Sequence, residues 1–243
     1  MSEIIAGRNP VREALRAGRP INKIMVAKGT GAGPLSEIIN LAREKNIPIQ
    51  MVERTNLDKL NPGAPHQGVV AYAAAKEYVE VEDILEIARA RGEDPFIVML
   101  DEINDPHNLG AILRTVDAAG AHGVIIPQRR SVALTSTVAK ASAGAVEYVP
   151  VARVTNLDQT IRQLKNQGIW VVGADMEGPQ IHWKAKLTGP LLLVIGGEGK
   201  GIGRLIKERC DMLVRLPMAG RGESLNASVA AALLVYEVVR QRG

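Results

Sequence analysis

Cysteine is almost absent from this 243-residue chain, which contains Cys210 and no other. A single cysteine excludes an intramolecular disulfide and a cysteine-based zinc cluster. Aromatic residues make up 3% of the chain, which argues against a base-stacking platform of the RRM type. No apolar run approaches the ~18 residues of a membrane span, and the first ten residues lack the layout of a signal peptide. We therefore expect a cytoplasmic protein with no membrane partner.

Motifs for several common enzyme chemistries are missing as well. The four histidines do not show the H-E-x-x-H spacing of a zinc site, so we expect no bound metal. The chain has no G-x-S-x-G nucleophile elbow. The glycine-rich segment 196–201 fits neither a P-loop nor a dinucleotide-binding fingerprint. These absences argue against a metalloenzyme, a serine hydrolase and a nicotinamide dehydrogenase.

Charge divides the chain into three regions. Residues 1–75 carry 10 Lys+Arg and 6 Asp+Glu, residues 76–94 carry 3 and 7, and residues 95–243 carry 17 and 13. The net charge of +4 permits nucleic-acid binding without requiring it. We predict an N-terminal domain over 1–75, an acidic linker with a short amphipathic helix over 76–94, and a C-terminal domain over 95–243.

Both predicted domains have the pattern of α/β folds. The first combines helices with short strands, and its first helix is expected to start at Pro10. In the second, apolar strands alternate with helices, which predicts a parallel sheet covered on both faces. Ligands bind beyond the carboxyl ends of the strands in such sheets. Three loops at predicted strand ends are therefore candidates for the site.

The first candidate loop follows a strand that ends at Leu100 and contains acids, amides and His107. We expect the next helix to begin near Asn108, which is a good N-cap. Arg114 lies on that helix. One interpretation of Arg114 is a solvated surface residue, and the other is a side chain that leans back toward the helix N-terminus.

The other two candidate loops combine glycine with polar side chains. In LLLVIGGEGKGI an apolar strand runs into four glycines around Glu198, and glycine lets the backbone approach a ligand closely. In GRGESLNASVAAALLVYE, Ser224 and Asn226 are both possible helix N-caps. A helix N-terminus also suits an anionic group, so capping and ligand binding are compatible. The apolar residues that follow with helical spacing are Leu225, Val229, Leu233 and Tyr236.

Taken in order, NDPHNLGAILRTVDAAG, LLLVIGGEGKGI and LPMAGRGESLNASVAAALLVYE resemble the three motifs of the SpoU/TrmH RNA ribose 2′-O-methyltransferases, which belong to the SPOUT superfamily. The N-terminal GRNPVREAL and HQGVVA are similar to the substrate-binding domain of the subgroup that methylates 23S rRNA. The resemblance therefore spans nearly the whole chain. One departure is Ala6, which stands where an aromatic residue or a histidine is common in the family.

This resemblance implies a fold, a cofactor and partners. The fold is α/β: a C-terminal SPOUT domain with a parallel sheet and a deep trefoil knot, preceded by a small α/β RNA-binding domain. The cofactor is S-adenosyl-L-methionine. The partners are RNA, above all 23S rRNA, and a second copy of the chain, with the C-terminal helix and the first-motif helix at the homodimer interface. The implied cofactor-binding residues are Gly173, Ala174, Gly196, Gly197, Leu216, Met218, Leu225, Asn226 and Ala227.

The resemblance also assigns catalytic roles in transferring a methyl group to a ribose 2′-hydroxyl, with a guanosine in the peptidyl-transferase loop as the implied target. Arg114 assists loss of the hydroxyl proton, and Asn108 orients it. Because arginine is always protonated, a guanidinium that polarises the hydroxyl and grips the adjacent phosphate is physically easier than a true base. Glu198 orients Arg114 or accepts hydrogen bonds from RNA, Ser224 holds a phosphate, and Asn226 binds cofactor and ribose. The implied RNA-binding residues are Arg8, Asn9, Arg12 and Arg16.

Two alternatives stay open. The first is the same chemistry on a tRNA or on another rRNA site, although the minimal tRNA enzymes lack an N-terminal domain of this kind. The second is a non-catalytic RNA-binding ribosome-assembly factor on a methyltransferase scaffold. The complete set of candidate catalytic residues argues against the second alternative.

Overall fold

The computed structural model describes residues 2–30, 32–62 and 65–243, and the chain divides into two compact units. The first unit comprises Met1–Glu77 and Leu134–Tyr148, and the second comprises Tyr78–Ala133 and Val149–Gly243. Residues 134–148, which the sequence division placed in the C-terminal domain, thus belong to the first unit. Most of the predicted linker belongs to the second.

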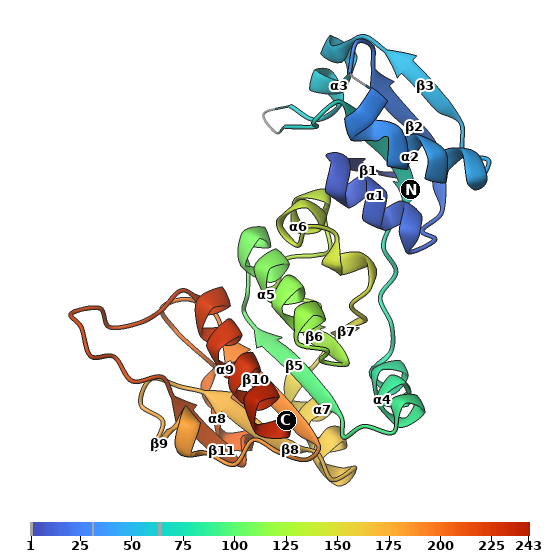
Figure 1. Ribbon diagram of the computed structural model, residues 1–243. Helices are drawn as coiled ribbons and strands as arrows, with labels where there is room; N and C mark the ends of the chain where they lie inside the picture. Colours follow the sequence, from blue (N-terminus) through green and yellow to red (C-terminus); the bar gives the residue numbers. More distant parts are fainter. Residues whose placement is uncertain (1, 31, 63–64) are drawn as a thin grey trace. The chain divides into compact units, whose positions relative to one another are not determined.

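The first unit is built on a four-stranded sheet in the order β1-β4-β2-β3 (Figure 1). The sequence did not lead us to expect β1 or α3, and α1 begins two residues before Pro10. The elements are β1 (Ser2–Ala6), α1 (Arg8–Arg16), β2 (Ile21–Ala27), α2 (Ala32–Glu44), β3 (Ile49–Val52), α3 (Arg54–Leu60), β4 (Val69–Ala74), α6 (Ser136–Ala141) and the 3-10 turn η1 (Ala145–Glu147).

Alternation along β2 explains how this sheet builds a core on each face. Successive strand side chains point to opposite faces. Ile24 and Val26 pack with α1 and α2, whereas Met25 and Ala27 pack with Leu57 of α3. The four-stranded sheet is therefore stabilised by apolar side chains that are buried on both of its faces.

The second unit contains a seven-stranded sheet in the order β7-β6-β5-β10-β8-β11-β9, and every neighbouring pair is parallel. The predicted parallel sheet is confirmed; the trefoil knot remains a prediction. The strands are β5 (Phe96–Asp101), β6 (Gly123–Pro127), β7 (Val151–Val154), β8 (Trp170–Ala174), β9 (Gln180–Ile181), β10 (Leu191–Gly196) and β11 (Met212–Arg215). The helices are α4 (Val81–Arg91), α5 (Pro106–Ala118), α7 (Leu157–Asn166), the 3-10 turn η2 (His182–Lys184), α8 (Arg204–Arg209) and α9 (Ala227–Arg242).

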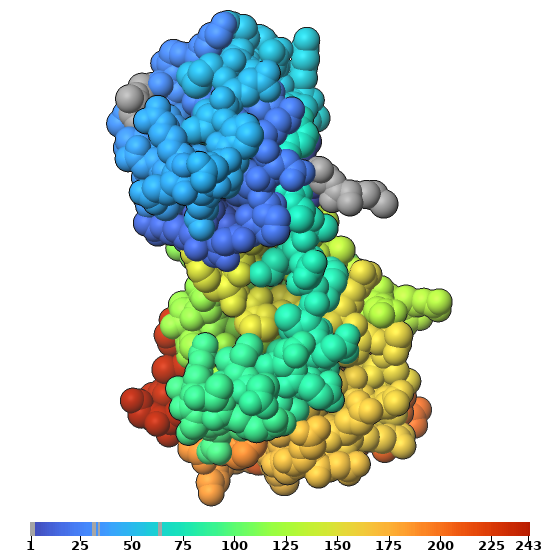
Figure 2. Space-filling model, turned by 90° about the vertical axis from the view of Figure 1, so that its right-hand side faces the viewer, coloured from blue at the N-terminus to red at the C-terminus, as the bar shows by residue number. Residues whose placement is uncertain are grey.

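The amphipathic helix predicted in the acidic segment is α4, and it packs on the second unit. Ile84 and Leu85 join the core on one face of the sheet, together with Ile97 and Ile161. Gly123 at the start of β6 leaves the room that Ile84 fills, since a Cβ there would lie 2.7 Å from Ile84 Cδ1. Figure 2 shows the blue-green residues of α4 lying on the outside of the second unit.

Parallel pairing brings the carboxyl ends of β5, β10, β8 and β11 to one edge of the sheet, in that spatial order. The loops that leave these strands include all three candidate loops of the sequence. Helices α5 and α9 pack against each other beside this edge (Figure 1). Across the described residues, no helix combines the length and apolar character needed to cross a membrane.

Candidate active site

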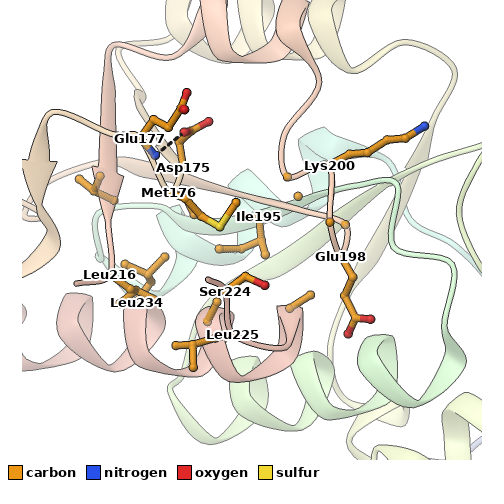
Figure 3. Close-up of a pocket in the computed structure, with 18 of the residues that line it drawn as sticks. Asp175, Met176, Glu177, Ile195, Glu198, Lys200, Leu216, Ser224, Leu225 and Leu234 are labelled. Carbon is orange, nitrogen blue, oxygen red and sulfur yellow. Dashed lines mark hydrogen bonds between the residues drawn. The ribbon is translucent and has the colours of Figure 1, made fainter. Parts of the chain in front are cut away.

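A pocket opens at the carboxyl ends of β10, β8 and β11, with an empty volume of about 990 Å³ (Figure 3). Pockets of this size and position commonly take small-molecule ligands in parallel α/β sheets. Its lining comes from the loops after the three strands and from the first turns of α9. The lining residues are Ala174–Glu177, Ile195–Gly201, Lys207, Val214, Leu216, Met218, Ser224, Leu225, Ala227, Ala230 and Leu234.

The glycine loop after β10 needs glycine for a steric reason. A Cβ on Gly196 would lie 2.0 Å from the backbone carbon of Gly201, and one on Gly197 would lie 2.6 Å from the carbonyl oxygen of Glu102. The loop therefore closes on itself and against the loop after β5. Gly201 N donates to Gly197 O at 3.0 Å, which fixes the turn.

The pocket combines an apolar wall with charged groups. Leu216, Leu225 and Leu234 lie along one side in Figure 3, and Met176 extends into the hollow from the loop after β8. Lys207 forms an ion pair with the buried carboxylate of Asp175, and both line the pocket. An apolar wall suits a flat ring, and a mixed set of carboxylates and lysines suits a nucleoside that carries charges of both signs, such as S-adenosyl-L-methionine.

A hydrogen-bond network joins the three candidate loops beside this pocket. Asn108 Nδ2 donates to Glu198 Oε1 at 3.0 Å, and Asn226 Nδ2 donates to the same oxygen at 2.6 Å. Asn226 Nδ2 also donates to Asn108 Oδ1 at 2.9 Å. Asn108 is 7% exposed, so its amide depends on these protein partners. Asn108 lies 90 positions from Glu198 and 118 positions from Asn226 in the sequence, yet the three side chains form one polar cluster.

The structure decides which residues cap the two helices. The prediction that Asn108 is the N-cap of α5 is wrong: the helix begins at Pro106, and Asp105 accepts a hydrogen bond from His107 N. Proline at the first helical position favours this earlier start. Asn226 is the N-cap of α9, and its Oδ1 accepts from the backbone of Ser228 and Val229. Asn226 therefore combines capping with the inter-loop network.

The remaining predicted catalytic residues differ in their surroundings. Arg114 is exposed and has no hydrogen bond or ion pair to any residue that the structure describes. Glu198 contacts Asn108 and Asn226 and not Arg114, so the suggestion that it orients Arg114 is not supported by this geometry. Ser224 lies exposed at the pocket rim.

Asp101, at the end of β5, holds the segment that follows the glycine loop through a hydrogen bond. Its Oδ2 accepts a hydrogen bond from Gly203 N at 2.8 Å, and the residue is buried. Burial raises the pKa of this carboxyl above its ordinary value, against the opposing effect of the Gly203 hydrogen bond. The side chain fixes the point where the loop turns into α8.

The predicted cofactor residues largely meet at the pocket. Seven line it: Ala174, Gly196, Gly197, Leu216, Met218, Leu225 and Ala227. Gly173 does not; it is packed under Cys210 and Leu213, which leave no room for a Cβ. Asn226 contributes to the adjacent network instead. Leu225 is 37% exposed, so this residue lies at the pocket and not in the buried core.

Sequence reasoning missed the charged wall that follows β8. Asp175, Met176 and Glu177 line the pocket, as do Lys200 and Lys207. The available signal was the position of Asp175 directly after the strand IWVVGA, since polar residues at a parallel strand's carboxyl end favour a ligand site.

The predicted RNA-binding residues lie on α1, but two are engaged with acids. Arg12 Nε pairs with Glu13 at 2.8 Å, and Arg16 pairs with Glu13 and Glu37. Arg8 Nε donates to the carbonyl oxygen of Gln67 at 3.1 Å. Asn9 is exposed. The described residues contain no cluster of three or more His, Cys, Asp or Glu side chains placed to hold a metal.

Comparison with known sequences matches both units. Residues 95–236 match the model of the SpoU rRNA Methylase family, and residues 4–79 match the model described as RNA 2'-O ribose methyltransferase substrate binding. A protein of Bacillus subtilis (strain 168), whose name describes it as a TrmH family tRNA/rRNA methyltransferase, YacO, is 52% identical over 240 residues, which cover 99% of this chain and 96% of the relative.

Solved structures of similar fold contain the cofactor. The SpoU methyltransferase AviRb from Streptomyces viridochromogenes in complex with AdoMet has a TM-score of 0.82 and 27% identity, and the match covers 99% of this chain and 90% of that one. An AdoMet-bound rRNA methyltransferase from Sinorhizobium meliloti has a TM-score of 0.82 and 26% identity, with 98% and 87% covered.

Proposed function

Because the chain belongs to the SpoU rRNA Methylase family and is an RNA methyltransferase that uses S-adenosyl-L-methionine, we propose that it methylates the 2′-hydroxyl of a ribose in RNA. The observation that carries the proposal is the network of Asn108, Glu198 and Asn226, which joins all three motif loops next to a pocket of suitable chemistry. A network of this kind holds reacting groups in a fixed geometry.

The pocket residues supply the surface to which we propose that the cofactor binds. Leu216, Leu225 and Leu234 form the apolar wall for the adenine, and Gly196 and Gly197 also line the pocket. Bound there, S-adenosyl-L-methionine supplies a methyl group on a positively charged sulfur. Asp175 is paired with Lys207, so of the two carboxylates that follow β8 it is Glu177 that offers unpaired negative charge to the pocket among the described residues.

Arg114 is the residue that we assign to the RNA side of the site. Its guanidinium is exposed and unpaired among the described residues, so it is available to a phosphate. An arginine presents several donors in a fixed fork and grips phosphate bidentately. Held there, it stabilises the oxygen that becomes negative as the 2′-hydroxyl proton passes to solvent water and the oxygen takes the methyl group. Ser224, at the pocket rim, adds a hydroxyl donor for the same phosphate.

The substrate that we propose is 23S rRNA, at a guanosine of the peptidyl-transferase loop, as in the RlmB-type enzymes that the motifs resemble. In support, residues 4–79, which make up most of the first unit, match the substrate-binding model, and an rRNA methyltransferase aligns over 98% of the chain. A tRNA or another rRNA position is the alternative, since the B. subtilis relative is named for both classes. We expect the protein to act in the cytoplasm, where this RNA is assembled.

We also propose that the enzyme is a homodimer. Val229, Leu233 and Tyr236 lie four and three residues apart on α9 and are 47%, 48% and 50% exposed. They form one apolar stripe on the outside of the helix. Exposed apolar stripes of this kind are typical of protein interfaces, and the family resemblance implies an interface between two copies at this helix.

Arg114 offers the sharpest test of the assigned chemistry. Arg114→Ala is expected to reduce methyl transfer to RNA by about 100-fold or more, because a charge-stabilising donor is lost, while S-adenosyl-L-methionine still binds. Arg114→Lys is also expected to be poor, since lysine cannot grip phosphate bidentately. The measurements are transfer of labelled methyl to RNA and cofactor affinity by calorimetry. Turnover at the wild-type rate in Arg114→Ala would remove Arg114 from the mechanism.

A further inference from the structure

The first unit contains a second, smaller hollow that the cofactor pocket does not explain. It has an empty volume of about 360 Å³ and lies where the loop before α1, the turn before β4 and the end of α6 meet. Figure 1 shows α6 beside α1 within this unit. The residues that line it are Ala6, Gly7, Asn9, Pro10, Pro65, Gln67, Lys140 and Ala143.

The polar side chains of this hollow suit an anionic, hydrogen-bonding ligand. Among the described residues that line it, Lys140 is the one that carries a charge, and none is a carboxylate. Lys140 and Asn9 are exposed, and neither side chain has a hydrogen bond or ion pair within the described part of the chain. Gln67 uses its Oε1 to accept from Arg8 N at 3.0 Å, which leaves its amide NH₂ as a donor. The NH₂ groups of two amides and one ammonium group therefore line the hollow without a hydrogen-bond partner among the described residues.

The backbone around the hollow is held in unusual conformations. Gln67 and Ala143 both line it and both have positive φ, 53° and 52°. Residues with side chains adopt this region uncommonly, and such residues gather at ligand sites. Arg8 holds Gln67 by donating to its carbonyl oxygen, and Gly68 follows with φ 86°.

Lys140 belongs to the segment Leu134–Tyr148, and buried ion pairs hold this segment in the first unit. Arg19 pairs with Glu147 at 2.7 Å and with Glu3 at 2.6 Å, and the Arg19 and Glu147 side chains are 5% and 1% exposed. Lys76 Nζ donates to the carbonyl oxygen of Glu147 at 2.7 Å. A segment that matches the methylase family model is thus a fixed part of the substrate-binding unit.

We propose that this hollow binds a nucleotide of the substrate RNA other than the one that is methylated. Lys140 contacts its phosphate, and the amides of Asn9 and Gln67 hydrogen-bond to the base edge, as single-stranded RNA is commonly read. The inference rests on the proposed function, and it moves the main contact away from Arg12 and Arg16, whose charge is offset by Glu13 and Glu37.

The test compares Lys140→Gln with Lys45→Gln in the full-length protein. Lys45 is an exposed lysine of the same unit, so the two substitutions remove the same charge. The probe is an unmodified 23S rRNA transcript, with a tRNA transcript in parallel, titrated at several salt concentrations. Lys140→Gln is expected to weaken binding of the substrate transcript about three- to tenfold and to lower the salt slope by about 0.7, the value of one phosphate contact on a single strand.

A second pair of variants tests the amide. Asn9→Asp is expected to weaken RNA binding more than Asn46→Asp, because the former places a carboxylate inside the hollow and the latter lies on an exposed turn. Cofactor affinity and the thermal midpoint should stay at the wild-type values in all four variants, since the cofactor pocket lies in the other unit.

The outcomes separate this inference from the proposed function. If the wild type binds and methylates a transcript while Lys140→Gln and Asn9→Asp match their controls, the hollow is not an RNA subsite and the inference is overturned alone. If the wild type binds neither transcript and transfers no methyl group, both proposals are overturned.

Discussion

At the scale of single residues, Glu198 contacts both of the other motif loops, as Asn108 and Asn226 also do. One of its oxygens accepts from the amides of both Asn108 and Asn226. Asn226 at the same time caps α9 through its own oxygen. A change at Glu198 therefore disturbs two asparagines whose orientations depend on it.

This arrangement predicts different results for two substitutions at Glu198. Glu198→Gln keeps an oxygen that can accept both hydrogen bonds, so stability should change by less than about 1 kcal/mol. Glu198→Ala leaves the amide of the buried Asn108 without its acceptor and should cost about 1–3 kcal/mol. Denaturant titration measures both, and methyl transfer should fall further in the alanine variant. Equal stability of the two variants would show that the hydrogen bonds to Glu198 do not hold the loops.

Sequence patterns located these residues but could not describe their contacts. Glycines after a buried strand, and Ser224 and Asn226 before a helix, are visible in the sequence. The hydrogen-bond partners lie far apart along the chain, and a choice between Asn108 and Asp105 as the cap depends on where Pro106 starts the helix. The expected cap at Asn108 failed because its local preference was outweighed by the proline two residues earlier.

At the scale of elements, α9 shows what periodicity can and cannot decide. Apolar residues occur on nearly all sides of this helix, so the pattern does not select the buried face. Its buried side is formed by Ala231, Leu234 and Val238, among others, whereas Leu233 and Tyr236 face outward. The continuous apolar run of β10, in contrast, predicted a strand buried on both faces, and that prediction is confirmed.

A cluster of hydrogen bonds around Glu237 stabilises the last turns of α9. Arg240 donates to both of its oxygens, at 2.9 and 2.7 Å, and Gln241 Nε2 donates at 2.7 Å. Gln241 also binds the backbone of Ala185 and Leu187. The helix end is thus tied to the segment that precedes β10.

This cluster predicts a pH dependence of stability. The hydrogen bond from Arg240 lowers the pKa of Glu237 to about 2 from an ordinary 4.5. A lowered folded-state pKa stabilises the protein above pH ~4.5, and this stabilisation is lost as the pH falls from there toward 2. Because the Arg240 side chain is 64% exposed, solvent screening limits the effect to about 1 kcal/mol.

Glu237→Gln should therefore reduce the free energy of unfolding at pH 7, with a deficit that shrinks below pH 4.5. Denaturant titrations across pH 2.5–7 measure it, with Glu82→Gln on the exposed side of α4 as the control. A deficit that stays constant over this range would mean that the charge of Glu237 contributes nothing.

At the scale of the whole molecule, the division into units differs from the charge pattern that first suggested it. Composition separates 1–75 from 95–243, yet residues 134–148 fold with the first unit. The burial of Arg19 explains the difference, because its partners Glu3 and Glu147 lie 16 and 128 residues away. Charged side chains are seldom buried, so residue type alone predicts that Arg19 is exposed. The fold instead buries Arg19 and brings Glu3 and Glu147 to it as ion-pair partners.

The outward stripe of α9 makes a prediction about assembly. Leu233→Glu should raise the dissociation constant of the homodimer by about tenfold or more, because a two-fold interface contains each substitution twice. Leu205→Glu on α8 is the matched control, since Leu205 is similarly exposed at 51%. Sedimentation equilibrium measures both variants. A wild-type monomer, or a dimer unaffected by Leu233→Glu, would contradict the proposed interface.

The central claim is methyl transfer to a ribose of RNA. The most direct measurement is to incubate the protein with methyl-labelled S-adenosyl-L-methionine and unmodified 23S rRNA and tRNA transcripts, and to map the label by nuclease digestion and mass spectrometry. The account predicts a 2′-O-methylated guanosine in the peptidyl-transferase loop of 23S rRNA, formed by the wild type and lost in Arg114→Ala. A methyl group on a base, or no transfer to either RNA by a protein that binds the cofactor, would contradict it.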